Sequence, residues 1–541
     1  MATCGEALVG LLAQYGVECI FGIPGVHTVE LYRGVAASSL RHITPRHEQG
    51  AGFAADGYAR VSGKPGVCFI ITGPGMTNIA TAMAQALADS IPMLVVSSVN
   101  ARHQLGRGNG HLHELPSQQK LVAGVSVFSH TLMSPDALPE VLARAFAVFA
   151  SARPGPVHIE IPLDVIVAPA DHLLLAMATL PARPAAAPAQ IQQAAQLLAS
   201  AQRPLILVGG GALDAAQPLL ALAQALQAPV QLTINAKGLL PPTEPLLSGS
   251  IQSTQAGRLL ARQADVVLAV GTELGETDYD AVFDGGFALP GRLVRIDIDP
   301  AQLARNYRCE IGIVADAAQA LSALVDAVNA LPARAPTPGW GAARAQAAWA
   351  DAQAEYDAPT RSLAALIALV DQALPGAIFV GDSTQTVYVG NLSFNPLGTR
   401  RWFNASTGYG TLGYGLPAAN GAQLAAPGTP VVALVGDGGL LFTLSELATA
   451  IEARLPVVVL LWNNQGYGEI KKFMLRTGVA PIGVDLATPD FVAIAQGFGC
   501  HAETVADPDQ LRAALARTTG RDRPTLINID EADWFRATAV G

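Results

Sequence analysis

The sequence predicts an α/β protein made of three doubly wound parallel-sheet domains. Short apolar runs rich in Val and Ile alternate with Ala- and Leu-rich helical stretches along the whole chain. This alternation is typical of parallel strands that are covered by helices on both faces. Two Pro- and Ala-rich stretches, Leu180–Gln190 and Leu331–Trp340, resemble linkers. The length of 541 residues suffices for three or four domains.

The two linkers divide the chain into expected domains at 1–180, 190–330 and 345–541. Each domain contains several candidate strands of four to six residues. We expect strands at Val67–Ile71, Pro92–Ser97, Val157–Ile161, Leu205–Val208, Val266–Val270, Val294–Ile298, Ala377–Val380, Val431–Val435, Val457–Leu461 and Thr525–Ile529. Open parallel sheets bind ligands at the carboxyl ends of their strands, so functional residues should follow these runs.

Composition excludes several classes of protein. A formal net charge of −10 argues against a nucleic-acid binder, which normally carries a basic face. The five cysteines are scattered, so we expect neither a disulfide framework nor a zinc site. The first ten residues lack the pattern of a signal peptide, and no long apolar run predicts a membrane span. We therefore expect a cytoplasmic protein.

The strongest local pattern is a βαβ unit in the third expected domain. The apolar strand Val431–Val435 ends at a Gly-Asp-Gly-Gly turn that contains Asp437, and a helix is expected from Leu440 to Arg454. The next strand, Val457–Leu461, is followed by Asn464. Because parallel neighbouring strands end at the same edge of a sheet, Asp437 and Asn464 should lie close together.

These residues fit a magnesium site. Carboxylate and amide oxygens are hard ligands, and the backbone carbonyl of Gly466 could add a third. The glycines beside Asp437 would let a diphosphate approach the amides at a helix start. The Gly-Asp-Gly turn alone could be an ordinary strand-to-helix connection, but Asn464 follows Asp437 at a spacing of 27 residues, which makes the metal interpretation stronger.

This segment, GDGG followed by WNNQGYG, resembles the cofactor motif of thiamine diphosphate-dependent enzymes. The resemblance implies that Mg²⁺ is held by Asp437, Asn464 and the Gly466 carbonyl, and that it anchors the diphosphate of the cofactor. The remaining cofactor contacts expected in this segment come from Gly436, Gly438, Gly439 and Tyr467.

A second motif resembles the segment that bears the catalytic glutamate in acetolactate synthase-like enzymes. It reads RHEQGAG at Arg46–Gly52 and continues with ADGYAR at Ala55–Arg60. The resemblance implies that Glu48 binds the cofactor and hydrogen-bonds N1′ of its aminopyrimidine, which favours the tautomer that removes the C2 proton. A carboxylate in a site of low dielectric has a raised pKa and can share its proton with the ring.

Further segments carry the same resemblance. They are FGIPG at Phe21–Gly25, TGPGMTN at Thr72–Asn78, DSIP at Asp89–Pro92 and GTLGYGLPAA at Gly410–Ala419. The resemblance implies that Gly73 contacts the cofactor, that Leu412 wedges beneath it and enforces a bent form, and that the Gly410 carbonyl accepts from its 4′-amino group. In the middle domain, Gly209–Gly211 follows a strand; we expect a structural turn there, with bound FAD as the minority interpretation.

The reaction follows less directly from these motifs. No Trp follows the Asn-Asn pair, which counts against acetolactate synthase. The histidines at His111 and His113 are separated, and Val26 and His27 follow the FGIPG turn where pyruvate decarboxylases carry Asp directly after it, which counts against that enzyme. The segments GIPGVHTVELYRG and HLHELPSQ make the chain most similar to 5-guanidino-2-oxopentanoate decarboxylases, which would release 4-guanidinobutanal and CO₂.

Two acidic residues could bind the cationic tail of such a substrate. Asp382 should lie at a strand end and Glu469 just beyond the metal ligands. Either could pair with a guanidinium, although each could also be a solvated loop carboxylate, and Glu469 could instead act catalytically as a proton relay. His27, as a further catalytic candidate, and His113 are also expected to contact the substrate.

Other readings remain open: a carboligase of the acetolactate synthase or benzaldehyde lyase type, and a non-catalytic homologue that only binds cofactor. The intact Glu48, Asp437 and Asn464 argue against the latter. The family resemblance also implies a homodimer with shared active sites, with assembly into a homotetramer, and no nucleic-acid or membrane partner.

Overall fold

The computed structural model describes residues 2–280, 283–332 and 337–539. The chain folds into two compact units. Unit 1 consists of Met1–Ala182, Ala377–Thr384 and Tyr409–Trp534, and unit 2 consists of Arg183–Gly376, Gln385–Gly408 and Phe535–Gly541. The second expected linker includes residues 333–336, which lie outside the described residues.

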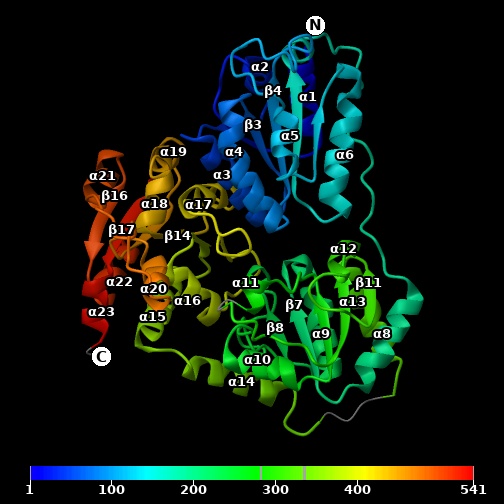
Figure 1. The fold of residues 1–541 in the computed structure, drawn as a ribbon, viewed down its shortest axis with the longest axis vertical. Helices are drawn as coiled ribbons and strands as arrows, with labels where there is room; N and C mark the ends of the chain where they lie inside the picture. Colours follow the sequence, from blue (N-terminus) through cyan, green and yellow to red (C-terminus); the bar gives the residue numbers. More distant parts are fainter. Residues whose placement is uncertain (1, 281–282, 333–336, 540–541) are drawn as a thin grey trace. The chain divides into compact units, whose positions relative to one another are not determined.

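Unit 1 contains two parallel sheets (Figure 1). The first has the order β2-β1-β3-β4-β6-β5, and in the second β12, β14, β15, β17 and β16 follow one another. The strands of the first sheet are β1 (Cys19–Gly22), β2 (Arg41–Ile43), β3 (Gly66–Ile70), β4 (Met93–Val99), β5 (Phe128–Thr131) and β6 (Pro156–Pro162). The strands of the second are β12 (Ile378–Gly381), β14 (Val431–Gly436), β15 (Val458–Asn463), β16 (His501–Val505) and β17 (Thr525–Asp530).

Helices cover both faces of the first sheet. Helices α1, α2 and α6 share one apolar core with alternate strand residues such as Val67 and Phe69, whereas Cys68 on the other face reaches the Ala51 carbonyl of α3. The helices of this half are α1 (Cys4–Gln14), α2 (Val29–Ala36), α3 (Glu48–Ser62), α4 (Pro74–Ala88), α5 (Gln118–Ala123), α6 (Leu138–Ser151) and α7 (Leu163–Ile166). Those around the second sheet are α17 (Gly415–Ala425), α18 (Asp437–Thr443), α19 (Glu446–Glu452), α20 (Gly468–Arg476), α21 (Phe491–Gly497) and α22 (Pro508–Ala516), and the chain ends in α23 (Glu531–Thr538).

Unit 2 is built on one parallel sheet with the order β11-β10-β9-β7-β8. Its strands are β7 (Pro204–Val208), β8 (Val230–Leu232), β9 (Val266–Val270), β10 (Arg292–Asp297) and β11 (Ile311–Val314), and the unit also holds β13 (Trp402–Asn404). Alternate residues of β7 enter two different cores, one shared with α8, α9 and α13 and the other with α10 and α14. Its helices are α8 (Pro188–Ser200), α9 (Ala216–Leu226), α10 (Gln255–Gln263), α11 (Glu276–Tyr279), α12 (Pro300–Leu303), α13 (Ala317–Asn329), α14 (Ala342–Ala354), α15 (Ala358–Ala373) and α16 (Gln385–Ser393).

The structure confirms the predicted fold class and all ten predicted strands, with ends shifted by one or two residues. One helix was predicted wrongly. The expected helix Leu440–Arg454 is two helices, α18 and α19, and the first begins at Asp437. Thr443 donates to the Gly413 carbonyl at 2.8 Å, and Glu446 binds backbone amides of residues 46 and 47, so tertiary hydrogen bonds on either side of the break override the local helical pattern.

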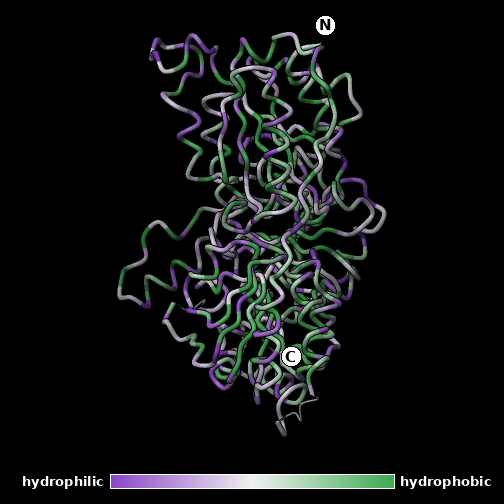
Figure 2. The backbone as a smooth tube through the Cα atoms, turned by 90° about the vertical axis from the view of Figure 1, so that its right-hand side faces the viewer, coloured by the Kyte–Doolittle hydropathy of each residue, from purple (hydrophilic) through white to green (hydrophobic). Residues whose placement is uncertain are grey.

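Hydropathy follows this architecture. Figure 2 shows apolar stretches running through the interior and hydrophilic stretches mostly in outer turns. The five residues of β3 and the seven of β4 are all buried, as strands between two helical layers must be. None of the helices in the described ranges has both the length and the apolar character that a membrane span needs. All five cysteines lie in described residues, and each is a free thiol.

Helices α3 and α17 lie side by side in unit 1 and pack backbone against backbone (Figure 1). A Cβ on Gly57 would lie 2.0 Å from the Ala418 carbonyl oxygen, and one on Gly421 would lie 1.8 Å from the Ala54 carbonyl oxygen. Both distances are far inside van der Waals contact, so only glycine fits at either position. Residue numbers rise along α3 as they fall along α17, and the two helices are therefore antiparallel.

We predict that Gly421→Ala lowers the stability of the protein, because the added methyl group must push the two helices apart. Overpacking of this kind costs about 1–3 kcal/mol. The matched control is Gly497→Ala at the end of α21, where a Cβ would meet no atom within 4 Å. Urea unfolding followed by circular dichroism should show a lower midpoint for Gly421→Ala and an unchanged or higher midpoint for Gly497→Ala. Equal midpoints for both variants would contradict the packing argument.

Candidate active site

Functional residues follow the strands at the carboxyl edges of both sheets in unit 1. In the first sheet, β2 and β3 lie on opposite sides of β1, and doubly wound folds bind ligands at the carboxyl edge of such a reversal in strand order, here between β1 and β3. His27 follows β1 and Gly73 follows β3 at this point. In the second sheet, Asp437 follows β14 and Asn464 follows its partner β15.

The three predicted metal ligands converge. One terminal atom of the Asn464 amide lies 2.8 Å from the Gly466 carbonyl oxygen and 3.0 Å from Asp437 Oδ1. If this atom is the amide nitrogen, it donates to both oxygens. If it is the amide oxygen, three oxygen atoms face one another, and a cation between them would stabilise the arrangement. A hard divalent cation is the ligand that such an oxygen set fits.

Asp437 itself requires a positive partner. Its side chain is 1% exposed, and Oδ2 has no hydrogen-bond partner. Burial raises the pKa of this carboxyl, although nearby backbone amides offset part of the effect. Because an unpaired buried carboxylate is costly, this arrangement fits a bound cation. Gly466, the third candidate ligand, must be a glycine, because a Cβ there would lie 2.1 Å from the Val484 carbonyl oxygen.

The start of α18 belongs to the candidate metal site, because Asp437 is the first residue of this helix. Its N-cap residue is Gly436, which provides no side chain to bond the first amides. The ring of Tyr467 lies against the second residue of the helix, because a Cβ on Gly438 would be 2.7 Å from it. Tyr467 therefore covers this turn, as expected for a residue that would contact a bound diphosphate.

Glu48 is the first residue of α3 and joins two of the sequence motifs. Asn78 donates to Glu48 Oε2 at 2.9 Å, and a Cβ on Gly75 would lie 3.4 Å from Oε1. Gly75 and Asn78 belong to the TGPGMTN segment at the start of α4. The carboxylate is half-buried, so one oxygen is oriented by the protein while the group stays accessible to a ligand.

His27 and His113 form a pair beside the same segment. Their ring centroids are 5.1 Å apart, and the Nδ1 atom of each is buried without a hydrogen-bond partner. Burial, together with the neighbouring His113, lowers the pKa of His27 and so favours the neutral form of the ring. A Cβ on Gly73 would lie 2.7 Å from the His113 carbonyl oxygen, so the pair sits directly against the turn into α4.

Asp382 does not lie where a substrate tail could reach it. The side chain is 1% exposed, and its oxygens accept from the amides of Ser383 at 2.8 Å, Gly413 at 2.9 Å and Gly415 at 3.3 Å. The carboxylate thus holds the loop that carries Leu412 against the second sheet. Its burial therefore argues against the predicted contact with a substrate tail, and its hydrogen bonds hold the loop that carries Leu412.

Glu469 lies on the exposed surface of α20 and pairs with Lys472 at 2.8 Å. Its side chain is 45% exposed, which leaves it available to a ligand. Gly410 is exposed with φ +74°, and Leu412 is half-buried. The structure therefore places both loop residues at the surface of unit 1, next to the Gly413 turn that Asp382 and Thr443 hold.

Two supporting residues escaped the sequence analysis. Asn78 orients Glu48, and it could have been found because it ends the TGPGMTN segment. Glu446 binds the two amides before Glu48, and no local pattern points to that contact, because the two partners are 400 residues apart.

Comparison with known proteins agrees with this geometry. Residues 2–121 match the N-terminal TPP binding domain of thiamine pyrophosphate enzymes, residues 191–324 the central domain and residues 382–529 the C-terminal TPP binding domain. A protein of Pseudomonas aeruginosa named "Probable 2-ketoarginine decarboxylase" is 48% identical over 98% of this chain and 94% of its own. The chain belongs to the thiamine pyrophosphate enzyme family.

Two further relatives of this chain are named acetolactate synthases. A probable acetolactate synthase large subunit of Methanocaldococcus jannaschii is 33% identical over 97% of this chain and 91% of its own. The large subunit of acetolactate synthase isozyme 1 of Escherichia coli is 32% identical over 97% of this chain and 93% of its own. Thiamine diphosphate, the same compound as thiamine pyrophosphate, is therefore the cofactor of this enzyme.

The glycine run of the central domain is packed by the protein itself. A Cβ on Gly209 would lie 2.2 Å from the Gly271 carbonyl oxygen, and one on Gly211 would lie 2.9 Å from the Gly271 Cα. Gly209 and Gly271 follow the neighbouring strands β7 and β9. The run therefore forms the predicted close turn between two strand ends.

We predict that Asp382→Asn loosens the loop that carries Leu412, even without bound cofactor. The variant lacks the negative charge that strengthens the hydrogen bonds from the amides of Gly413 and Gly415. Hydrogen exchange of the apoenzyme should be faster at Gly413 and Gly415, with peptides of α22 unchanged as the internal control. Unchanged protection of the two amides would contradict this role.

The same variant should alter the dependence of stability on pH. Burial raises the pKa of Asp382 to about 6, so its contribution to stability is full below about pH 4 and is lost as the pH rises to about 6. The unfolding free energy of the metal-free wild type, relative to that of Asp382→Asn, should fall by at most about 3 kcal/mol over this range. Parallel pH curves would contradict the assignment.

Proposed function

We propose that this thiamine diphosphate enzyme decarboxylates 5-guanidino-2-oxopentanoate (2-ketoarginine) without oxidation, giving 4-guanidinobutanal and CO₂. The observation that carries the proposal is the 48% identity, over nearly the whole chain, to the protein named as a 2-ketoarginine decarboxylase. The convergent Asp437, Asn464 and Gly466 and the oriented Glu48 support an active enzyme, as opposed to a homologue that only binds the cofactor.

We also propose that Mg²⁺ is held by Asp437, Asn464 and the Gly466 carbonyl and links the chain to the diphosphate. When bound, the cofactor supplies the electron sink for loss of CO₂. The chain orients it: Glu48 would hydrogen-bond the pyrimidine, Leu412 would pack beneath it and the Gly410 carbonyl would accept from its amino group. Gly73, Gly436, Gly438, Gly439 and Tyr467 complete the proposed cofactor contacts.

His27 and His113 are proposed to contact the reacting end of the substrate. Their unpartnered nitrogens and the neutral state of His27 fit a hydrogen bond to the 2-oxo group or delivery of a proton. A neutral ring has a further advantage here. A cation at this position would stabilise the substrate carboxylate and so oppose the loss of CO₂.

We propose that the tail of the substrate is bound by Glu469. This carboxylate is exposed three residues after Gly466, a proposed metal ligand, and it already pairs with a cation, the Lys472 ammonium. A guanidinium could replace the ammonium and pair through two parallel hydrogen bonds, which a point charge cannot do. Glu469 as a catalytic proton relay is the competing role.

The active unit is proposed to be a homodimer with shared sites, which can pair into a homotetramer. Tyr414 contacts Asp56 of α3, eight residues after Glu48. At 1.5 Å per residue, Glu48 lies about 12 Å farther along the helix, at the opposite end of the α3–α17 pair from the Leu412 loop. A hydrogen bond spans about 3 Å, so the Glu48 that completes a cofactor site would come from a second copy.

Exposed apolar side chains support the same assembly. Val26 and Leu112, beside the two histidines, are 71% and 60% exposed. On the other half of the proposed site, the exposed residues are Leu441, Phe442, Ile470, Phe473, Leu475, Val479 and Ile482. Many exposed large apolar side chains are typical of an interface, and a second copy would cover both halves.

The three domains, at 1–180, 190–330 and 345–541, also remain a proposal.

The carboligase alternative has specific support, since two relatives at 32–33% identity are named acetolactate synthases. In that case the decarboxylated intermediate would be joined to a second carbonyl compound. Product analysis with and without added pyruvate distinguishes the two: the aldehyde should dominate in both, and a carbon–carbon ligation product as the main species would overturn the decarboxylase proposal.

We predict that 5-guanidino-2-oxopentanoate has a kcat/KM at least about tenfold above that of pyruvate, because one charged hydrogen bond contributes about 1.5–3 kcal/mol. Glu469→Gln should narrow this ratio, whereas a proton relay would slow both substrates alike. The matched control is Asp509→Asn in α22, another exposed carboxylate that pairs with a residue three positions later. Preference of the wild type for pyruvate would refute the substrate, and an unchanged ratio in Glu469→Gln would refute the tail-binding role.

A further inference from the structure

A buried carboxylate lies behind the turn that leads to Glu48. Glu446 is the first residue of α19 and is 1% exposed. Its Oε1 atom accepts from the amide of Arg46 at 2.9 Å and from the amide of His47 at 3.1 Å. Its Oε2 atom accepts from the Thr449 hydroxyl at 2.6 Å. Three hydrogen bonds thus hold the side chain of Glu446, whose helix packs around the second sheet of unit 1.

The two amides that Glu446 binds are those immediately before the catalytic glutamate. Two successive N–H groups directed at one oxygen fix the orientation of the peptide between them. His47 is also the N-cap of α3, where its Nδ1 atom accepts from the Gln49 amide. The direction in which the chain enters α3, and therefore the position of Glu48, depends on this acceptor.

The first turn of α3 is shaped around the carboxylate. A Cβ on Gly50 would lie 2.3 Å from Glu446 Oε1, so a side chain at this position would displace the acceptor. The backbone of Glu446 is held in turn, because its carbonyl accepts from Asn420 of α17 at 3.2 Å. The contact is therefore built from both sides.

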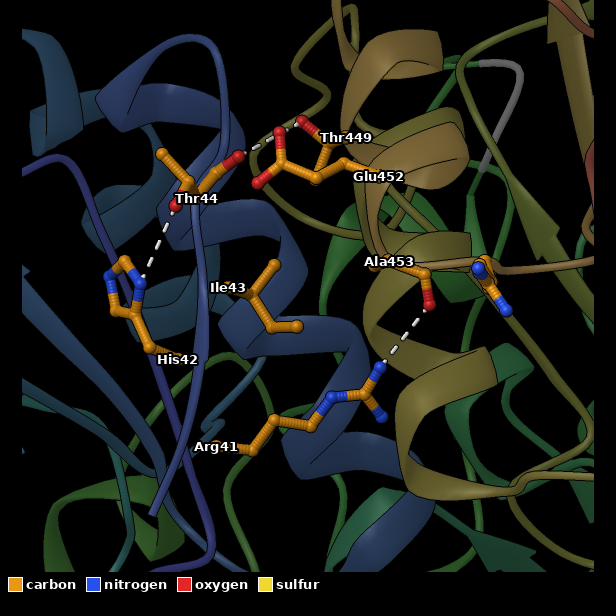
Figure 3. Close-up of a pocket in the computed structure, with 8 residues that line it drawn as sticks. Arg41, His42, Ile43, Thr44, Thr449, Glu452 and Ala453 are labelled. Atoms are coloured by element: carbon orange, nitrogen blue, oxygen red, sulfur yellow. Dashed lines mark hydrogen bonds between the residues drawn. The ribbon is translucent and has the colours of Figure 1, made fainter. Parts of the chain in front are cut away.

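Helix α19 lies alongside the chain segment that connects β2 to α3. Figure 3 shows Thr449 and Glu452 facing Thr44, and Arg41 reaching the Ala453 carbonyl, along a groove between the two elements. Thr449 lies 3.5 Å from the Thr44 carbonyl oxygen, and Arg41 donates to Ala453 at 3.2 Å. The Arg41 contact is exposed, whereas the Glu446 residue itself is buried.

Burial of an acid at this place has a cost. Desolvation raises the pKa of Glu446, and the bonds from Thr449, Arg46 and His47 offset it. A structural contact alone could be made by an apolar residue at lower cost, because a buried carboxylate is stable only where it is fully hydrogen-bonded. The carboxylate provides a strong hydrogen-bond acceptor for the backbone amides of residues 46 and 47, which an apolar residue could not provide.

We propose that Glu446 is a positioning residue that fixes the turn before Glu48 and so sets the placement of the catalytic carboxylate. The inference rests on the proposed role of Glu48. It assigns no contact between Glu446 and the cofactor or substrate. The acceptor geometry is what matters, so a glutamine, whose carbonyl oxygen can accept from both amides, should replace Glu446, whereas alanine or the shorter aspartate should not.

The first measurement is hydrogen exchange in the full-length apoenzyme. Glu446→Ala and Glu446→Asp should lose protection at the amides of Arg46 and His47, and Glu446→Gln should keep it. The control is Glu452→Gln on the same helix, which contacts the side chain of Arg46 but not the backbone. Unchanged protection in the alanine and aspartate variants would overturn the proposal.

The second measurement is proton exchange at C2 of the cofactor in the magnesium-loaded holoenzyme. Displacement of a catalytic group by about 1 Å can cost about 10²-fold, so we expect a decrease of about 10- to 100-fold in the alanine and aspartate variants. Cofactor affinity and KM should stay within about threefold, and Glu446→Gln and Glu452→Gln should remain near the wild type. If the alanine variant does not fold, the contrast between aspartate and glutamine decides the question.

Glu48→Gln, measured in parallel, distinguishes a failure of the proposed Glu48 role from a failure of the Glu446 inference. If its C2 exchange is that of the wild type, the proposed role of Glu48 is wrong. If Glu48→Gln is slow and Glu446→Asp exchanges like the wild type, only the Glu446 inference fails. The double variant Glu48→Gln/Glu446→Asp should be no slower than Glu48→Gln, because both changes act on one group; additive losses would mean that Glu446 acts elsewhere.

Discussion

The close contact between α3 and α17 fixes the geometry on which the proposed site depends. Gly57 and Gly421 let the two backbones touch, and a buried polar network continues the contact. Arg60 pairs with Asp56 and with Asp89, each at 2.6 Å, and Tyr414 donates to Asp56. Removing one partner from a buried ion pair costs about 3–5 kcal/mol, so this network permits few changes.

Each end of this helix pair carries part of the proposed chemistry. Glu48 begins α3 at one end, and the Leu412 loop precedes α17 at the other. Since the helices are antiparallel, one chain separates the two groups that a single cofactor would need. The same arrangement supports the proposed two-chain sites, in which each copy contributes Glu48 to one site and Leu412, Asp437 and Asn464 to the other.

Much of the fold could be predicted because parallel strands are marked by continuous apolar runs. The strands missing from the prediction are mostly short, such as β2 and β8 with three residues each, or lie at sheet edges and are less buried, such as β5 and β16. Their weaker apolar pattern gives little signal. The break between α18 and α19 was missed because distant hydrogen bonds produce it.

The site divides along the same line. Asp437, Asn464 and Glu48 lie in motifs that the sequence analysis could recognise, and the proposed metal ligands lie close together as the spacing of Asp437 and Asn464 predicts. Asp382 was misassigned because its position at a strand end is visible in the sequence, whereas the amides of Gly413 and Gly415 that occupy it are not. Glu446 was invisible for the same reason.

Complementation between two inactive variants tests the central claim most directly. Glu48→Gln and Asp437→Ala chains carry defects on opposite halves of the proposed site. If sites are shared, a purified hybrid of one chain of each kind contains one site with both defects and one intact site, and it should recover Mg²⁺-dependent decarboxylation to about half the wild-type level per dimer. A hybrid that is as inactive as both parents, while still dimeric and folded, would contradict the account.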